Sequence, residues 1–305
     1  MQTTHYGFVH LEFGSTRRPA SLELIARLRN ALGQRHGART SLLIVDNALA
    51  AGTPAQSLPS GDETLRVIPG DNTNREFSGW DVGVADVLSR GEVPDVWIFT
   101  NDTVCAHHGW SPARADRFAN ETAALSAHAG PWMLGEVIHH PKPMRTPCGP
   151  QLDFIGTYCF AMNETLRQGL GTLSPGNALL DGFVHDTFEP AHRLFRDNVD
   201  PGYAEAQLAW LVADSDDHSK EKARRFRWSF SWHNAKPLDA GSFDDLRAKV
   251  RCIVAEHGLS VRARRLGADV RSPYDARTAR ERFANTLAYF ADKMWERRYL
   301  KRRMG

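Results

Sequence analysis

Acidic and amide side chains follow three short apolar runs in the first third of the chain. A carboxylate that leaves a strand can hydrogen-bond a base or ribose, or bind Mg²⁺ or Mn²⁺ beside phosphates. Taken singly, such residues are as well explained as turns and helix caps. Their recurrence favours a ligand site. The three exits are Asp46-Asn47, the turn Asp71–Asn74, and Asn101-Asp102.

Alternating strands and helices are needed to bring these exits together. Apolar runs of four to eight residues predict buried strands, and apolar residues at helical spacing predict the helices between them. The expected strands are Tyr6–Phe13, Ser41–Val45, Thr64–Ile68, Val96–Phe99 and Trp132–Val137. The expected helices are one capped by Ser21 and carrying Leu22, Ile25, Leu28 and Leu32, then Glu76–Arg90 and Ala113–Ala127. This order predicts an α/β domain with a mostly parallel sheet, in which ligands bind at the carboxyl ends of the strands.

Composition narrows the class of protein. The chain has 305 residues, 42 % of them hydrophobic, with a formal net charge of +2. That balance is typical of a globular protein and does not favour nucleic acid as a partner. No apolar run is long enough for a transmembrane helix, and the first residues lack the pattern of a signal peptide. We therefore expect a cytoplasmic protein.

The strand exits resemble a known family. Leu42–Asn47 is similar to the "iiVVDNaS" stretch of the large inverting family of nucleotide-sugar glycosyltransferases with the GT-A fold. Asp71–Val84 resembles the helix start that follows it, and Trp97–Val104 resembles the "LLNPDTV" form of the D-x-D motif in rhamnosyltransferase-type members. The resemblance extends over roughly residues 1–215.

The resemblance implies roles for these residues. Asp46 would contact the base of the donor nucleotide, and Asp102 would reach the diphosphate directly or through Mn²⁺ or Mg²⁺. The exit turn and the helix after it would complete the nucleotide site. Its further members are Asp71, Asn72, Asn74 and Asp81.

A cation must meet the nucleoside diphosphate as it leaves. Asn101-Asp102 offers one carboxylate where D-x-D proteins offer two. His233–Pro237 follows a further expected strand, Phe226–Trp232. It is similar to, though shorter than, the H-x-x-G-x-x-K-P segment of glycogenin-like enzymes. That likeness implies His233 as a metal ligand and Lys236 as a diphosphate ligand. A strand-end loop with a surface lysine is the alternative.

An inverting transferase also needs a general base. In the resembling family the base is the aspartate of an "E-D" pair, but here Glu205 is followed by Ala206. Glu205 and Asp181 are the candidates, with Asp153 and Asp186 as further carboxylates nearby. Glu205 is equally explained as a solvated residue in the first turn of a helix. Glu136, at a strand end, could face the acceptor.

The last third of the chain is rich in basic residues. Ala279–Arg303 has helical period, with Phe283, Leu287, Phe290 and Met294 on one face and a basic run from Arg297 to Arg303. Such a face is more often packed on its own domain, and we expect that here. The alternative is a basic amphipathic helix on an anionic membrane surface.

The sequence as a whole predicts a GT-A-like domain over 1–240, with a nucleotide half (1–110), an acceptor half (111–240), and a helical extension over 241–305. The expected activity is transfer of a sugar from a nucleotide-sugar donor to a glycan or lipid-linked glycan in surface polysaccharide assembly. The expected location is the cytoplasm, with the inner membrane face as the alternative if the C-terminal helix binds there. Two alternatives stand beside it: a non-catalytic GT-A-derived partner protein, and a Rossmann-like methyltransferase. The methyltransferase is disfavoured because the first strand exits with Gly14 alone, instead of a glycine-rich turn.

Overall fold

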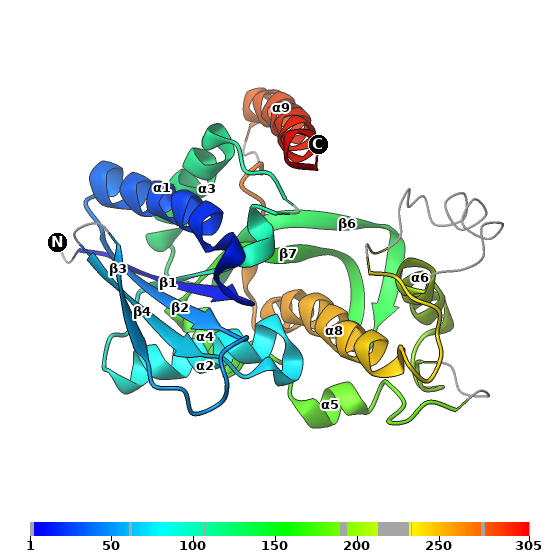
Figure 1. Ribbon diagram of the computed structural model, residues 1–305. Coiled ribbons are helices and arrows are strands. Elements are labelled where there is room, and N and C mark those ends of the chain that lie inside the picture. The colour runs from blue at the N-terminus through cyan, green and yellow to red at the C-terminus, as the bar shows by residue number, and fades with distance from the viewer. Residues whose placement is uncertain are drawn as a thin grey trace. The chain divides into compact units, whose positions relative to one another are not determined.

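The computed structural model describes residues 3–60, 63–106, 108–189, 194–212, 232, 234–275 and 278–304. These residues form an α/β fold around one mixed, mostly parallel sheet flanked by helices (Figure 1). The strand order is β3-β4-β2-β1-β5-β7-β6-β8. The described strands are β1 His5–Glu12, β2 Arg39–Asp46, β3 Gln56–Ser60, β4 Glu63–Pro69, β5 Val96–Asn101, β6 Trp132–Thr146, β7 Gly149–Asn163 and β8 Asp269–Arg271.

Helices connect and cover the strands. The described α-helices are α1 Arg18–His36, α2 Glu76–Ser89, α3 Pro112–Ser126, α4 Glu164–Leu170, α5 Asn177–Asp181, α6 Pro201–Leu211, α8 Phe243–Arg265 and α9 Ala279–Met304. Three short 3₁₀ turns, η1 Ser15–Arg17, η2 Asn72–Asn74 and η3 Asp102–Val104, follow strands β1, β4 and β5. The predicted α/β class and mostly parallel sheet are confirmed: β4, β2, β1 and β5 run parallel, while β3 and β7 are antiparallel to their neighbours.

The central strand β1 is buried over all eight residues because helices cover both faces of the sheet. Helices α1 and α3 lie on one face and α2 and α4 on the other (Figure 1). Gly79 and Gly83 let α2 approach β1, since a Cβ at either position would come within 2.0 Å of Leu11 or 2.5 Å of Val9. Trp80 of α2 packs edge-on against Phe160, with 5.3 Å between the ring centroids.

Contacts divide the chain into two compact units. Unit 1 comprises 1–137, 155–173 and 263–305, and unit 2 comprises 138–154 and 174–262. Each has its own core. That of unit 1 joins β1 and β5 to α1 and α3, and that of unit 2 is built around Tyr203, Leu246 and Val250. The boundary expected at residue 240 on functional grounds lies within unit 2 and stays a prediction.

Two local predictions are wrong. Ser21 does not cap the first helix, because η1 runs directly into α1 at Arg18, with Pro19 in the first turn. The apolar face of α9 does not pack on the domain: Phe283, Leu287, Phe290 and Met294 are exposed. The strand expected over Phe226–Trp232 lies, apart from Trp232, outside the described residues.

Candidate functional site

The sheet has a topological switch point between β1 and β5. The chain leaves β1 toward β2 on one side, and the later strand β5 pairs on the other side, both parallel to β1. In open α/β sheets a ligand binds in the crevice outside the carboxyl ends of the strands at such a point. Glu12 ends β1, Asp46 ends β2, and Asp102 follows β5.

Glu12 and Arg18 form the centre of this edge. The Glu12 side chain is fully buried, and the Arg18 Nε donates to both of its carboxylate oxygens, at 2.9 and 3.1 Å. Burial raises the pKa of Glu12 although the Arg18 hydrogen bonds oppose that shift. The same hydrogen bonds raise the pKa of Arg18. The pair therefore keeps a guanidinium fixed at the switch point.

Asp46 is held at the tip of β2 by backbone groups. Its Oδ1 accepts hydrogen bonds from the N–H of Gly14 and of Ala48, both at 2.9 Å, and its Oδ2 lies 3.8 Å from Arg18 Nη2. Gly14 has φ 77°, a conformation that glycine adopts readily. The turn after β1 is thus fastened to the end of β2.

Asp102 lies on the other side of β1. Burial raises its pKa, against the opposing effects of Arg17 and of a backbone hydrogen bond from Phe13. Arg17 Nη1 is 3.7 Å from Asp102 Oδ2 and is about half exposed. Asn101 accepts from the Thr103 N–H at 3.1 Å and so caps η3. Phe13 exposes 64 % of its surface at the tip of β1. We call Glu12, Arg17, Arg18, Asp46 and Asp102 the strand-tip site.

The third predicted exit is built around Asn47. Its Nδ2 donates to Asn72 Oδ1 at 3.3 Å and to the Arg75 carbonyl at 3.1 Å. Asp71 caps η2 by accepting from the Thr73 N–H at 2.7 Å, and Asn74 is buried. Arg75 has φ 50°, a strained conformation for a residue with a Cβ. The turn is held firmly, in a shape that its own residues do not prefer.

Asp81, on α2, makes its hydrogen bond away from the turn around Asn47. Its Oδ1 accepts from the Leu173 N–H at 2.7 Å, which ties α2 to the segment after α4. This contact is structural, and a role for Asp81 toward a nucleotide stays a prediction.

The strand-tip site was tested against the expected divalent cation. Among the described residues, no three His, Cys, Asp or Glu side chains meet in a way that could hold a metal ion. Asp102 faces the guanidinium of Arg17, and like charge opposes a cation there. In this arrangement the described residues do not bring three such ligands together, and the expected cation stays a prediction. His233, the second expected ligand, lies outside them.

The remaining candidates belong to unit 2. Asp181, at the end of α5, forms ion pairs with Arg247 at 3.0 Å and Arg251 at 3.3 Å. Glu205 is half-buried within α6 and lies beyond its first turn, so the alternative of a solvated first-turn residue does not describe it. Lys236 Nζ pairs with Asp245. Their part in catalysis stays a prediction.

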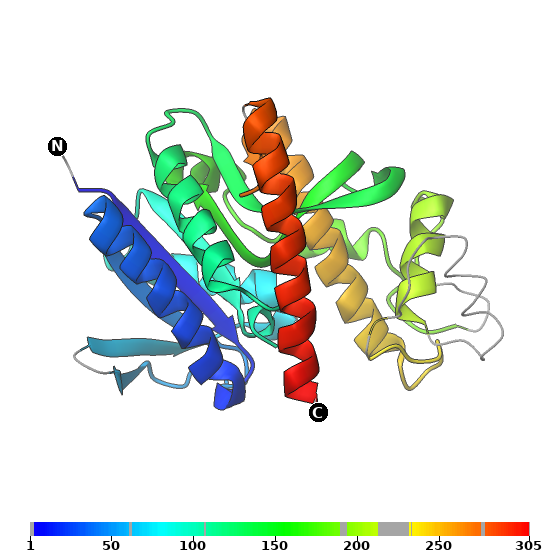
Figure 2. The ribbon, with the colours of Figure 1, turned by 90° about the horizontal axis from the view of Figure 1, so that it is seen from above.

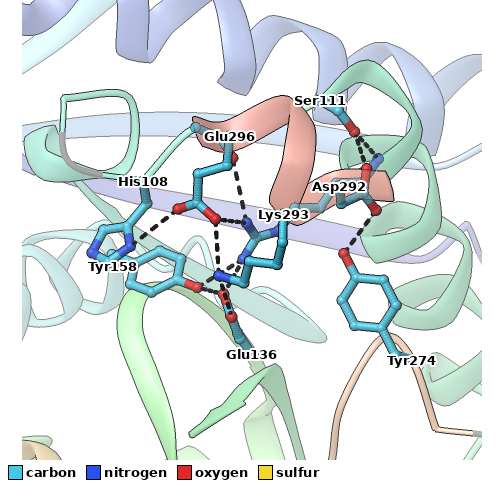
Figure 3. Close-up of polar contacts among 10 residues, drawn as sticks. His108, Ser111, Glu136, Tyr158, Tyr274, Asp292, Lys293 and Glu296 are labelled. Carbon is cyan, nitrogen blue, oxygen red and sulfur yellow. Dashed lines mark hydrogen bonds and ion pairs between the residues drawn. The ribbon is translucent and has the colours of Figure 1, made fainter. Parts of the chain in front are cut away.

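Glu136 is the centre of a buried polar cluster in unit 1. Figure 3 shows its carboxylate beside Tyr158 and Lys293. Lys293 Nζ lies at 2.8 Å, and the guanidinium of Arg114 donates to the same carboxylate. The Glu136 carboxylate is thus engaged by these neighbours inside unit 1. It does not lie free to contact a sugar acceptor.

Comparison with models of known protein families, with curated proteins and with solved structures gives no match to this chain. The class of protein is therefore argued from the fold and the site alone.

Sequence reasoning missed Glu12, Arg17 and Arg18 as site residues. Their signal was present in the run Glu12-Phe-Gly-Ser-Thr-Arg-Arg18, which leaves the first strand as the other exits leave theirs.

Proposed function

We propose that the chain is a GT-A-like glycosyltransferase that takes a sugar from a nucleotide-diphosphate sugar. The acceptor class is a glycan or lipid-linked glycan in surface polysaccharide assembly. The observation that carries the proposal is the strand-tip site, in which carboxylates and guanidiniums from three adjacent parallel strands and the turn after β1 gather at a switch point. That is where an α/β sheet binds a nucleotide.

Each group has a chemical part in the proposal. The Asp46 carboxylate accepts hydrogen bonds from the base, and the exposed ring of Phe13 offers a face on which the base stacks. Arg17 moves from Asp102 to the diphosphate. There its guanidinium stabilises the negative charge that develops on the diphosphate as the glycosidic bond breaks. Arg18 stays with Glu12 and holds the turn in place.

The base that deprotonates the acceptor is proposed to be Glu205. Asp181, whose carboxylate pairs with Arg247 and Arg251, is the second candidate. No step of this scheme requires a metal, and the divalent cation expected with Asp102 and His233 stays a prediction.

A non-catalytic partner protein is the second candidate. Ala206, where the resembling family carries its base, is buried in α6 among the core residues of unit 2. A carboxylate at that position would be desolvated without a described partner. A buried alanine at the position of the family's catalytic base is what we expect of a protein that has lost catalysis.

The test is a calorimetric titration of the full chain with uridine, guanosine and thymidine diphosphates, and with S-adenosylmethionine, each with Mn²⁺ and with excess chelator. The proposal expects one diphosphate to bind, and the corresponding nucleotide sugar to be hydrolysed or transferred. Binding without turnover in a full acceptor panel supports the partner protein. Binding of S-adenosylmethionine alone would contradict both.

A further inference from the structure

Helix α9 turns its polar side inward. Asp292 accepts from the Tyr274 hydroxyl at 2.8 Å and from Ser111, and Lys293 Nζ lies 2.8 Å from both Glu136 and Glu296 (Figure 3). Asp292 and Glu296 are buried. We call these contacts, together with Arg114, the α9 anchor.

The anchor fixes the rotation of the helix about its axis. Arg114 and Glu136 are almost fully buried and oppositely charged, and each receives a partner from α9. Turning α9 to bury another face would take Glu296 and Lys293 away from the buried Arg114–Glu136 pair, so these buried charges would lose part of their hydrogen bonding and charge compensation, which is unfavourable. The buried contacts of α9 therefore decide which of its residues face outward.

That outward face is apolar. Phe283, Leu287, Phe290 and Met294 expose between 55 % and 69 % of their surface. Their spacings of four, three and four residues place them in one row along the helix. We call this row the outer stripe. Figure 2 looks onto the side of unit 1 on which α1, α3 and α9 (red) lie nearest the viewer. A contiguous exposed apolar row of this kind marks an interaction surface.

Basic residues continue the row at both ends. Arg280 precedes Leu287 by seven residues, and Lys301 follows Met294 by seven, so each shares the outward face. Arg297 and Arg298 stand beside them, and all four are exposed. The three acidic residues of α9, Glu281, Asp292 and Glu296, fall on the opposite side. The outward face is thus apolar in its middle and cationic at its ends.

We propose that the outer stripe docks on an anionic membrane surface. The four apolar side chains enter the boundary between headgroups and acyl chains, while the basic side chains contact lipid phosphates. Among the described residues no helix is long and apolar enough to cross a bilayer. A second copy of the chain fits less well, because pairing two outer stripes in either direction brings basic ends together with no acidic group on the face to meet them. The proposal goes beyond the proposed transferase activity and needs no nucleotide.

The test is co-sedimentation of the full chain with vesicles of phosphatidylcholine alone or mixed with an equal amount of phosphatidylglycerol. We expect binding to the mixed vesicles only, weakening as salt is added. A stripe variant (F283S, L287S, F290S and M294S) should not bind. A charge variant (R280Q, R297Q, R298Q and K301Q) should lose about five-fold in affinity per charge, or about six-hundred-fold for all four.

The matched control for charge is R264Q with R265Q, two exposed arginines at the end of α8, and that for apolar exposure is V93S. Both should bind vesicles as the unaltered chain does. Thermal unfolding of every variant checks the fold, which the exposed substitutions should preserve. If the unaltered chain ignores the mixed vesicles, or if it is a dimer that the stripe variant makes monomeric, the proposal is overturned. Neither result depends on whether the chain transfers sugar.

Discussion

Single carboxylates at the strand-tip site have both a structural and a proposed chemical task. Asp46 holds the turn after β1 through Gly14, and Arg18 neutralises a fully buried Glu12. Truncating such a residue would therefore damage the fold and the ligand site together. An isosteric change that keeps the acceptor atom separates the two effects, because the backbone hydrogen bonds survive it.

We expect Asp46→Asn to weaken nucleoside diphosphate binding by about 1–3 kcal/mol, since the charged acceptor for the base is lost. The thermal midpoint should change little because the amide oxygen still accepts from Gly14 and Ala48. Calorimetry checks the first statement and thermal unfolding the second. Asp86→Asn is the control. Asp86 lies on α2, outside the strand-tip site, and pairs with Arg66 of β4, so this variant should bind nucleotide normally. Unchanged affinity in a folded Asp46→Asn protein would remove Asp46 from base recognition.

At the scale of elements, the attachment of α9 depends on ionised groups. Burial alone would raise the pKa of Glu136, but Arg114 and Lys293 outweigh it and hold the pKa below its ordinary value of 4.5. Glu296, Tyr158 and His108 face the same cluster. Because the folded pKa is the lower one, Glu136 contributes stability above about pH 4.5. That contribution is lost as the pH falls through the folded value.

Hydrogen exchange of α9 amides should therefore accelerate as the pH is lowered below 4.5, beyond the intrinsic change in rate. Glu136→Gln should destabilise the protein by about 3 kcal/mol at neutral pH, since Arg114 and Lys293 lose one buried counter-charge and are left to share Glu296. Its α9 should respond less to acid. Glu281→Gln, at the exposed start of the helix, keeps its cap on Thr278 and is the control. A Glu136→Gln protein with the acid response of the unaltered chain would show that the anchor does not hold α9.

The elements also show how far the sequence could predict this molecule. Fully apolar runs identified β2 and β5, and a mostly apolar one identified β1, because strands buried on both faces need no polar alternation. The short edge strands β3 and β8 carry no such run and were missed. For α9 the period was right but the buried face was wrong. Its partners lie far away in the chain: Ser111 and Asp292 are separated by 181 residues, and a helical pattern does not reveal which distant charges a helix will meet.

At the scale of the whole molecule, every member of the strand-tip site belongs to unit 1. The predicted residues Asp71, Asn72, Asn74 and Asp81 belong to it as well, whereas Lys236, Glu205 and Asp181 belong to unit 2. The proposed donor site is therefore made by residues of unit 1. A nucleotide that binds only the folded form adds about 2.7 kcal/mol of stability at a hundred-fold excess over its Kd, and local opening at the contacted segments becomes rarer by the same amount.

Hydrogen exchange with saturating nucleoside diphosphate should consequently slow at residues 12–18, 46–48, 71–76 and 101–104, where the turns after four parallel strands meet. Residues 203–211, which contain Glu205, should exchange as in the free protein, because no acceptor is present to engage them. The segment 234–238 is a separate readout, since protection there would bring Lys236 into contact with the diphosphate as the sequence predicted. The Asp46→Asn protein at the same nucleotide concentration is the control, and its protection should shrink at all four turns together. Protection that appears only in unit 2 would move the donor site away from the strand tips and with it the role of Arg17.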